Sequence, residues 1–333
     1  MRLLVTGAAG FIGSNFIHLL RQQRPDWTLR VLDLLTYAGH AANLEPHLGD
    51  GSVELRVGDV ADPEAVEQAL EGMDAVVHFA AESHVDRSIL GSAAFVRTNI
   101  VGTHTLLEAV RHRELPMVLV STDEVYGDLG PDDPAFTEAN LICPSSPYSA
   151  SKAGADHLAL AFVRTFGTDV RITRCSNNYG PRQFPEKLIP LMIGKIAQGE
   201  PCPVYGDGQQ VRDWIHVDDH NEAVLAVLER GGVGEVYNLG GDNELANLQV
   251  LEDIGAAVGR APVLEYVKDR PGHDRRYAMD CAKIAAELGW TAQRSWAEGL
   301  EQTVAWYQGQ GAWLESIRSG AYQDYLQANY GAR

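Results

Sequence analysis

A tyrosine and a lysine stand four residues apart, at Tyr148 and Lys152, directly after Pro147. Proline suits the first turn of a helix, so the sequence predicts that a helix begins here. Side chains four residues apart share one helix face, which places the ammonium beside the phenol. A phenol with an ordinary pKa of about 10 is a weak base at neutral pH, and we expect the ammonium to lower that pKa. The pair could then take a proton from an alcohol while hydride leaves for a cofactor. The alternative is a surface tyrosine beside a solvated lysine.

Two adjacent carboxyl groups follow a short apolar run at 117–120, in the sequence Ser121-Thr122-Asp123-Glu124-Val125-Tyr126-Gly127. Ligands of open α/β sheets bind beyond the carboxyl ends of the strands, so Asp123 and Glu124 should face a site. Adjacent carboxyl groups in a partly closed site titrate apart, which provides one acid and one base. The alternative is a helix cap or a turn cluster.

Three glycines lie between an apolar run at 3–5 and a helical pattern from residue 11, in Thr6-Gly7-Ala8-Ala9-Gly10-Phe11-Ile12-Gly13. Glycines permit a tight turn, the approach of a pyrophosphate to the backbone, and close packing of helix on strand. The helix N-terminus then offers N–H groups and a positive dipole end to phosphates. The spacing is G-x-x-G-x-x-G, so the match to the common G-x-G-x-x-G pattern is inexact.

Asp33 ends the second expected strand, twenty residues after Gly13. A carboxylate there accepts hydrogen bonds from an adenosine ribose and repels a 2′-phosphate. The following Leu34-Leu35-Thr36 offers no arginine to a 2′-phosphate, so the sequence favours NAD over NADP. The positive charge of oxidised nicotinamide would lower the pKa of Tyr148 further. The alternative is an aspartate that only caps a turn.

The elements that must position these groups alternate between strand and helix. Apolar runs predict strands at 3–5, 30–32, 54–57, 75–79, 117–120 and 170–173, and helical patterns cover 11–20, 63–70, 95–112 and 152–166. Strands joined by helices imply parallel pairing, so the fold class is α/β with a doubly wound parallel sheet. After Pro181 frequent prolines and turn residues predict a smaller α/β substrate-binding lobe. We expect a dinucleotide-binding domain over 1–180, to which segments at about 211–240 return, and a mainly ligand-binding domain over 181–333.

The composition and charge of the chain argue against several classes of binding partner. The formal net charge of −18 argues against nucleic acid, and no apolar segment is long enough to span a membrane. A strand is expected from the first residues, so we expect no leader segment and a cytoplasmic protein. The four cysteines are far apart, which predicts neither disulfides nor zinc. His216 and His220 have no third ligand nearby, so we expect a helix start there and no metal.

Together, the glycine turn and the Tyr148–Lys152 pair resemble the extended short-chain dehydrogenase/reductases that act on sugar nucleotides, which have a Rossmann-type fold. The Thr122-Asp123-Glu124 set resembles the nucleoside-diphospho-glucose 4,6-dehydratases within that family. Longer strings at 33–39, 79–86, 174–181, 186–190 and 269–274 share the resemblance, which covers nearly the whole chain. Ala8 and His40 depart from the usual pattern without affecting the chemistry.

The resemblance implies NAD as cofactor, a nucleoside-diphospho-glucose, in particular dTDP-glucose, as substrate, and a dehydration that returns the cofactor unchanged. It also implies a homodimer through a four-helix bundle of the helices near 98–112 and 148–166. The implied catalytic residues are Thr122, Asp123, Glu124, Tyr148 and Lys152. The implied cofactor-binding residues are Gly7, Gly10, Phe11, Ile12, Gly13, Asp33, Leu34, Leu35, Thr36, Asp59, Val60, Phe79, Ala80, Ala81, Ser83, Thr98, Tyr148, Lys152 and Asn178. The implied substrate-binding residues are Ser83, Thr122, Asn177, Lys187, Leu188, Pro203, Val204, Tyr205, Arg212, Asn247, Asp269, Arg270 and His273.

Several alternatives stay open at this level. A UDP-sugar 4-epimerase or decarboxylase of the same superfamily would share most motifs, and Asp123-Glu124 is the feature that separates a dehydratase from them. A non-catalytic dinucleotide-binding sensor would not need its catalytic residues, and here all of them are present. Arg212 could form an ion pair with Asp213 or Asp218 instead of binding a diphosphate. The sequence does not decide between thymidine and uridine as the base.

Overall fold

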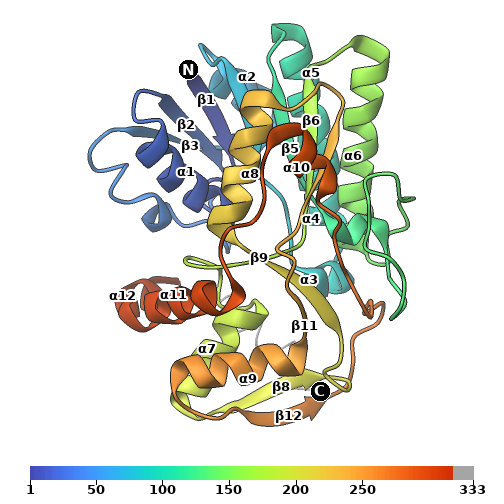
Figure 1. Cartoon of the computed structure of the whole chain (residues 1–333). Coiled ribbons are helices and arrows are strands. Elements are labelled where there is room, and N and C mark those ends of the chain that lie inside the picture. Colours follow the sequence, from blue (N-terminus) through green and yellow to red (C-terminus); the bar gives the residue numbers. More distant parts are fainter. Residues whose placement is uncertain (318–333) are drawn as a thin grey trace.

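A seven-stranded sheet forms the larger part of the molecule (Figure 1). The computed structural model describes residues 1–317 of the 333. Its strand order is β10-β6-β5-β4-β1-β2-β3, and every neighbouring pair is parallel. The strands are β1 (Arg2–Thr6), β2 (Thr28–Asp33), β3 (Val53–Val57), β4 (Ala75–His78), β5 (Met117–Thr122), β6 (Val170–Cys175) and β10 (Val236–Leu239). The doubly wound parallel sheet predicted from the sequence is confirmed, and its order reverses between β1 and β4, where such sheets bind their ligands.

Helices cover both faces of the sheet because successive strand residues point to opposite sides. On β1, Leu3 and Val5 pack with the first group of helices, α1 (Phe11–Gln23), α8 (Val217–Arg230) and α10 (Ala282–Leu288). Leu4, between them, packs with the second group, α2 (Pro63–Leu70), α5 (Thr103–Arg113) and α6 (Pro147–Phe166). All three side chains are fully buried, so both faces of the central strand are shielded from solvent. This explains the short, continuous apolar runs in the sequence.

The expected helix over 95–112 is not one regular α-helix. It comprises α4 (Ala93–Phe95), a π-helical stretch η2 (Val96–Gly102) and α5. Within η2, the buried Asn99 side chain bonds both backbone groups of Glu82 and donates to Ser151 Oγ at 2.8 Å. The wider π-helical turn therefore occurs where the Asn99 side chain bonds the loop at Glu82 to helix α6.

The smaller lobe lies below the sheet in Figure 1 and has its own apolar core. A three-stranded sheet orders β11 (Glu244–Ala246), β9 (Val211–His216) and β7 (Asn177–Tyr179), and a two-stranded sheet pairs β8 (Pro201–Tyr205) with β12 (Val263–Val267). The remaining helices are η1 (Ala41–Leu44), α3 (Val85–Leu90), η3 (Asp123–Tyr126), α7 (Leu188–Gln198), α9 (Asn247–Val258), α11 (Trp296–Gly309) and α12 (Gly311–Ile317).

The chain crosses between the two lobes more than once. After β9 in the small sheet, α8 and β10 return to the large sheet, and α10 packs beside β10. The division into a domain over 1–180 and a mainly ligand-binding domain over 181–333 stays a prediction, and residues 318–333 of the latter lie outside the described residues.

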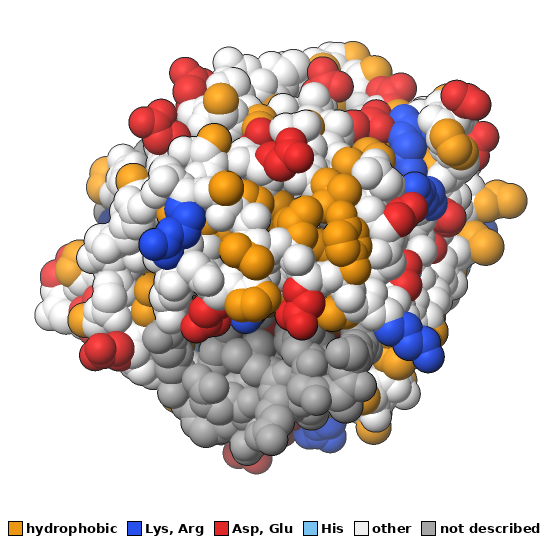
Figure 2. All heavy atoms as spheres, turned by 90° about the horizontal axis from the view of Figure 1, so that it is seen from below, with side chains coloured by type: hydrophobic (Ala, Val, Ile, Leu, Met, Phe, Trp, Pro, Cys, Tyr) orange, Lys and Arg blue, Asp and Glu red, His pale blue; other side chains and the backbone are white. Residues whose placement is uncertain are grey.

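The described surface and helices agree with the charge and hydropathy of the sequence. No helix within residues 1–317 has the length and apolarity needed to cross a bilayer. On the face shown in Figure 2, acidic side chains are more frequent than basic ones, in line with the net charge of −18. All four cysteines are free thiols in the structure.

Two helical glycines provide a matched test of the packing. A Cβ on Gly13 in α1 would lie 2.6 Å from the Ala8 Cα, whereas a Cβ on Gly194 in α7 meets nothing within 4 Å. Gly13→Ala should therefore lower the free energy of unfolding by about 1–3 kcal/mol, because backbone must move. Gly194→Ala should raise it by up to about 1 kcal/mol through helix propensity. Chemical denaturation measures both, and equal effects of the same sign would contradict this packing.

Candidate active site

The glycine turn forms a cradle without side chains at the carboxyl end of β1. Gly7 has φ +70°, and a Cβ there would lie 2.5 Å from the Ala80 backbone. Ala8 is not in the left-handed region, so alanine is tolerated at that position. Helix α1 begins after Gly10 with no side-chain cap, which leaves its first N–H groups to a ligand.

Asp33 ends β2 beside this turn and is nearly fully buried. Its two oxygens accept hydrogen bonds from the Ala9 N–H at 2.9 Å and the Leu35 N–H at 2.8 Å. Burial raises the pKa of Asp33, and these two bonds lower it. The carboxylate therefore braces the glycine turn as well as facing the cavity.

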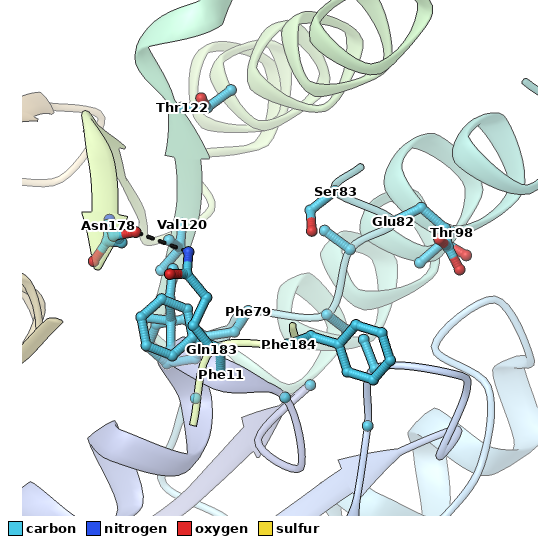
Figure 3. A pocket seen from close by; sticks show the side chains of 18 of the residues that line it. Phe11, Phe79, Glu82, Ser83, Thr98, Val120, Thr122, Asn178, Gln183 and Phe184 are labelled. Carbon is cyan, nitrogen blue, oxygen red and sulfur yellow. Dashed lines mark hydrogen bonds between the residues drawn. The ribbon is translucent and has the colours of Figure 1, made fainter. Parts of the chain in front are cut away.

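A cavity of about 340 Å³ opens along the carboxyl edge of the sheet. Every residue predicted to bind the cofactor lines it except Leu35. Leu35 has φ 53° and packs against the core between the sheet and α1, so its side chain points away. Figure 3 shows part of the lining, with Thr122 at a strand end and Ser83 and Thr98 across the space. The Gln183 amide donates to the Asn178 carbonyl oxygen at 3.0 Å, drawn as a dashed line.

Tyr148 and Lys152 lie in the first turns of α6, as predicted. Ser146 caps this helix in a capping box with Ser149, and Pro147 occupies its first turn. Both Tyr148 and Lys152 are buried and line the cavity. The Lys152 ammonium donates to the Val120 carbonyl oxygen at 2.8 Å, which fixes α6 to the end of β5.

The pKa of Tyr148 differs from the sequence expectation. The protein's own groups raise it well above the ordinary value, through burial first and then through the negative charge of Glu124, while a hydrogen bond with Thr122 lowers it. The protein's own groups therefore raise this pKa instead of lowering it, because burial and the charge of Glu124 are the largest contributions and Lys152 is not among the main ones.

The carboxyl pair lies on η3, directly after β5. Thr122 caps this short helix by accepting the Glu124 N–H at 3.3 Å, and its hydroxyl donates to Asp123 Oδ1 at 3.1 Å. Asp123 is 2% exposed, and its pKa is raised well above the ordinary value by burial and then by the charge of Glu124. Burial also raises the pKa of Glu124, but the positive charges of Arg270 and Arg212 oppose the shift. Asp123 is thus the stronger candidate for a protonated acid and Glu124 for a base.

A second cavity, of about 180 Å³, extends from Glu124 into the small lobe. It is lined by the predicted substrate residues except Thr122, which lines the first cavity, and Asp269. Asp269 instead bonds His273 Nδ1 at 2.6 Å and the Gln210 amide at 3.1 Å. Glu124 and Lys187 line both cavities, so the two spaces meet at the carboxyl pair.

Two arginines of the second cavity lie among polar groups, Arg212 buried and Arg270 half-buried. Arg212 donates to the Asp274 carbonyl oxygen at 2.9 Å and lies over the Tyr277 ring. It makes no ion pair with Asp213 or Asp218, so the alternative interpretation of Arg212 as an ion-pair partner is wrong. Arg270 approaches Asp86 Oδ1 at 3.3 Å, and the Tyr205 hydroxyl donates to Asp86 Oδ2 at 2.9 Å.

Sequence reasoning missed several lining residues. Glu186 is 3% exposed and accepts from Arg87 at 2.8 Å, while Arg87 lies over the Tyr37 ring. Tyr37, Glu186 and Asp86 fall within the family-like strings, which could have marked them. Trp214 lines both cavities and had no motif of its own.

Within the described residues, no group of three potential ligands could hold a metal ion. His216 caps α8, accepting the Asp218 N–H at 3.2 Å, so the predicted helix start is confirmed.

A doubly wound parallel sheet, a glycine cradle at its first turn and a Tyr-x-x-x-Lys helix at its carboxyl edge define an oxidoreductase-type nucleotide-binding protein of the short-chain dehydrogenase/reductase class. The family model described as GDP-mannose 4,6 dehydratase matches residues 4–303. A dTDP-glucose 4,6-dehydratase of Streptomyces antibioticus is 50% identical over 325 residues, 96% of each chain. The chain belongs to this family of nucleotide-sugar 4,6-dehydratases.

Solved structures agree with this grouping. A dTDP-glucose 4,6-dehydratase from Streptomyces venezuelae, solved with NAD and the ligand TYD bound, has a TM-score of 0.92 and 49% identity, covering 96% of this chain and 100% of that one. A UDP-glucose 4-epimerase of Thermus thermophilus, solved with NAD, has a TM-score of 0.86 and 30% identity, covering 93% and 100%.

The raised pKa of Asp123 predicts a pH-dependent gain from Asp123→Asn. A carboxyl whose folded pKa is raised contributes stability below its unfolded pKa of about 4 that is lost as pH rises toward the folded value. Asparagine does not titrate, so only the unmodified protein loses this stability as the pH rises. The unfolding free energy of the variant minus that of the unmodified protein should therefore increase by at least about 1 kcal/mol between about pH 4.5 and about pH 8. Thermal unfolding at both pH values measures the difference. The exposed Asp132→Asn is the control, and a gap that stays constant or shrinks would contradict the prediction.

Proposed function

We propose that this protein dehydrates dTDP-glucose to dTDP-4-keto-6-deoxyglucose, with NAD as a cofactor that is regenerated in each cycle. The observation that carries the proposal is the carboxyl pair Asp123–Glu124 at the junction of the two cavities, beside Tyr148 and Lys152. Relatives at 50% and 45% identity are dTDP-glucose 4,6-dehydratases, which supports it.

The first cavity fits NAD. Its glycine cradle would be filled by a Cβ at Gly7 or Gly13, and the open N-terminus of α1 suits a pyrophosphate. Asp33 stands where a ribose would lie, with no arginine in the three residues that follow it. When bound there, NAD would accept hydride from C4 of the sugar and return it to C6.

The oxidation uses the groups on α6 and β5. Tyr148 removes the proton of the sugar 4-hydroxyl, and Lys152 stabilises the phenolate. Thr122 donates a hydrogen bond to the 4-oxygen. Because the protein's own groups raise the pKa of Tyr148, we assign the compensating positive charge to the oxidised cofactor as well as to Lys152.

The elimination uses the carboxyl pair. The 4-ketone acidifies the C5 hydrogen, and Glu124 removes that proton as general base. Asp123, kept protonated by its buried position, donates a proton to the 6-hydroxyl, which leaves as water. The C5–C6 double bond then receives hydride at C6 and a proton at C5. One water is lost and the oxidation state of the sugar is unchanged overall, so no external oxidant is consumed.

The second cavity would hold the nucleotide. Arg212 and Arg270 line this cavity with guanidinium groups suited to a diphosphate, because planar forks bind oxyanions bidentately. Tyr205 offers a ring on which a pyrimidine can stack. Asn177, Lys187 and Asn247 complete the polar lining that we propose for the substrate.

Three observations weigh against the alternatives. A 4-epimerase oxidises C4 and returns the hydride to the same carbon without losing water, so it has no use for an acid with a strongly raised pKa beside a second carboxyl group. The epimerase structure is also less similar, at 30% identity against 49% for the dehydratase. A binding sensor would not need a buried Tyr148, Lys152 and Asp123 together in one cavity.

Glu124→Gln tests the proposal directly. The variant should lose at least about 10²-fold in formation of 4-keto-6-deoxy product, because an amide cannot take the C5 proton, while NAD binding stays unchanged. Product is measured by the absorbance of the 4-keto sugar in alkali, and bound NAD by its release on denaturation. Glu138→Gln, outside both cavities, is the control. Turnover at the unmodified rate would overturn the assignment.

The base preference is tested with dTDP-glucose and UDP-glucose side by side, and we expect the thymidine nucleotide to be preferred. We also propose a cytoplasmic location, which the four free thiols support because reducing compartments keep thiols unpaired.

We propose a homodimer through the helices near 98–112 and 148–166. Val96 and Val101 are 48% and 43% exposed on η2, and Phe166 is 51% exposed at the end of α6. Ala150 and Ala161 are also exposed on α6, so an apolar face extends along both helices.

Light scattering after size exclusion should give about twice the chain mass of 36.3 kDa. Val101→Glu should yield the monomer, because a charge in an apolar interface is costly to bury. Val263→Glu, an equally exposed valine on β12, should leave the dimer intact. A monomer in the unmodified protein, or a dimer in Val101→Glu, would contradict this interface.

A further inference from the structure

A buried ion pair lies behind the helix that carries Tyr148 and Lys152. Asp156 follows Lys152 by four residues on α6 and is fully buried, and Arg174 on β6 is 2% exposed. The Arg174 Nε donates to Asp156 Oδ2 at 2.9 Å. Neither residue lines either cavity, so neither reaches a ligand.

Arg174 also contacts the end of η3. Its Nη1 donates to the Tyr126 hydroxyl at 2.9 Å, and its guanidinium lies 4.8 Å from the Tyr126 ring centroid. The same hydroxyl donates to Asn238 Oδ1 on β10 at 2.7 Å. Tyr126 is thus held from two sides, and its ring stacks on Phe136 at 4.9 Å.

These contacts connect the two halves of the proposed reaction. Helix α6 carries the oxidation pair, Tyr148 and Lys152. The short helix η3 begins with the elimination pair, Asp123 and Glu124, and ends at Tyr126. Arg174 bonds both elements, with one nitrogen to α6 and another to η3.

A buried ion pair gives weak net stabilisation, because desolvating both charges offsets their attraction. Apolar side chains of similar volume would fill the same space at equal or better stability. A guanidinium does what they cannot, since its rigid fork fixes the direction of two partners at once. Its presence here is therefore better explained by geometry than by stability.

We propose that Arg174, held by Asp156 and bonded to Tyr126, is a positioning residue that sets the place of Asp123 and Glu124 relative to Tyr148 and Lys152. The inference rests on the proposed function, because it assigns different steps to the two pairs. The charge of Asp156 has a second effect in the same direction. Burial lowers the pKa of Lys152 and Asp156 raises it, so the carboxylate helps keep the ammonium charged.

The proposal has a kinetic signature. If η3 loses its bond to Arg174 while α6 stays in place, oxidation at C4 continues and proton removal at C5 slows. A displacement of about 1 Å can cost on the order of 10²-fold in rate. Enzyme holding the 4-keto sugar and reduced nicotinamide should then accumulate during turnover, because the step that consumes them is delayed.

Tyr126→Phe is the first test, since it removes only the hydroxyl and keeps the ring on Phe136. In the NAD-loaded enzyme with dTDP-glucose, we expect product formation to fall about 10- to 100-fold, and the steady-state fraction of reduced nicotinamide to rise. Tyr237→Phe is the matched control. Its hydroxyl also makes two hydrogen bonds, to Glu287 at 2.9 Å and from the Gly232 N–H at 3.0 Å, both partly buried, and neither goes to η3 or α6.

Arg174→Lys is the second test. Lysine keeps the charge opposite Asp156 and lacks the fork that reaches Tyr126, so it should reproduce the Tyr126→Phe pattern. The double variant Tyr126→Phe/Arg174→Lys should be no worse than either single one, because both remove the same bond.

The outcomes separate the two proposals. If the unmodified protein forms no 4-keto-6-deoxy product, the proposed function fails and the inference fails with it. If it forms product, the inference is overturned when either single variant turns over normally. It is also overturned when the rate of product formation and the fraction of reduced nicotinamide fall in proportion, as loss of folded protein would cause. A double variant whose loss of rate is the sum of the two single losses, in free energy, would overturn it as well.

Discussion

The arrangement of the site depends on parallel strand pairing. Strands that run the same way end at the same edge, so groups at the ends of β1, β2 and β5 meet, although Gly7 and Asp123 lie more than a hundred residues apart in the sequence. The glycine turn, Asp33 and the Asp123–Glu124 pair are all such groups. Helix α6 returns from that edge with Tyr148 at its start, and the Lys152 ammonium is bonded to the end of β5. One backbone constraint therefore assembles cofactor cradle, base and carboxyl pair.

Burial gives these groups their chemical character. Around Asp123 it acts together with the adjacent Glu124 and raises the pKa well above the ordinary value. Around Glu124 the arginines of the small lobe oppose the same effect. The two carboxyl groups are neighbours in sequence, but they face different charges, because the main charge acting on Asp123 is that of Glu124 and the main charges acting on Glu124 are those of Arg270 and Arg212. This difference is the physical basis for assigning an acid and a base.

The buried polar contacts around Arg174 and Asn99 serve a related purpose. Each bonds together two elements that line the site: Arg174 bonds η3 to α6, and Asn99 bonds the loop after β4 to α6. Directional bonds fix angles as well as distances, which apolar packing does less strictly. Such contacts are suited to a site whose proposed reaction passes one sugar through several proton transfers without moving it.

The sequence by itself determined the sheet class, the glycine turn and the start of α6, because these follow from local periodicity, turn chemistry and helix spacing. It also marked the candidate reacting side chains, through their residue types and the family resemblance. It did not determine the direction of the Tyr148 pKa, the packing of Leu35 against the core instead of the cavity, the engagement of Asp269 by His273, or the roles of Trp214 and Arg174 in the structure. Each of these depends on which groups from distant segments surround a side chain after folding. Only the tertiary structure brings the small lobe against the sheet edge, and burial and charge there decide what each residue can do.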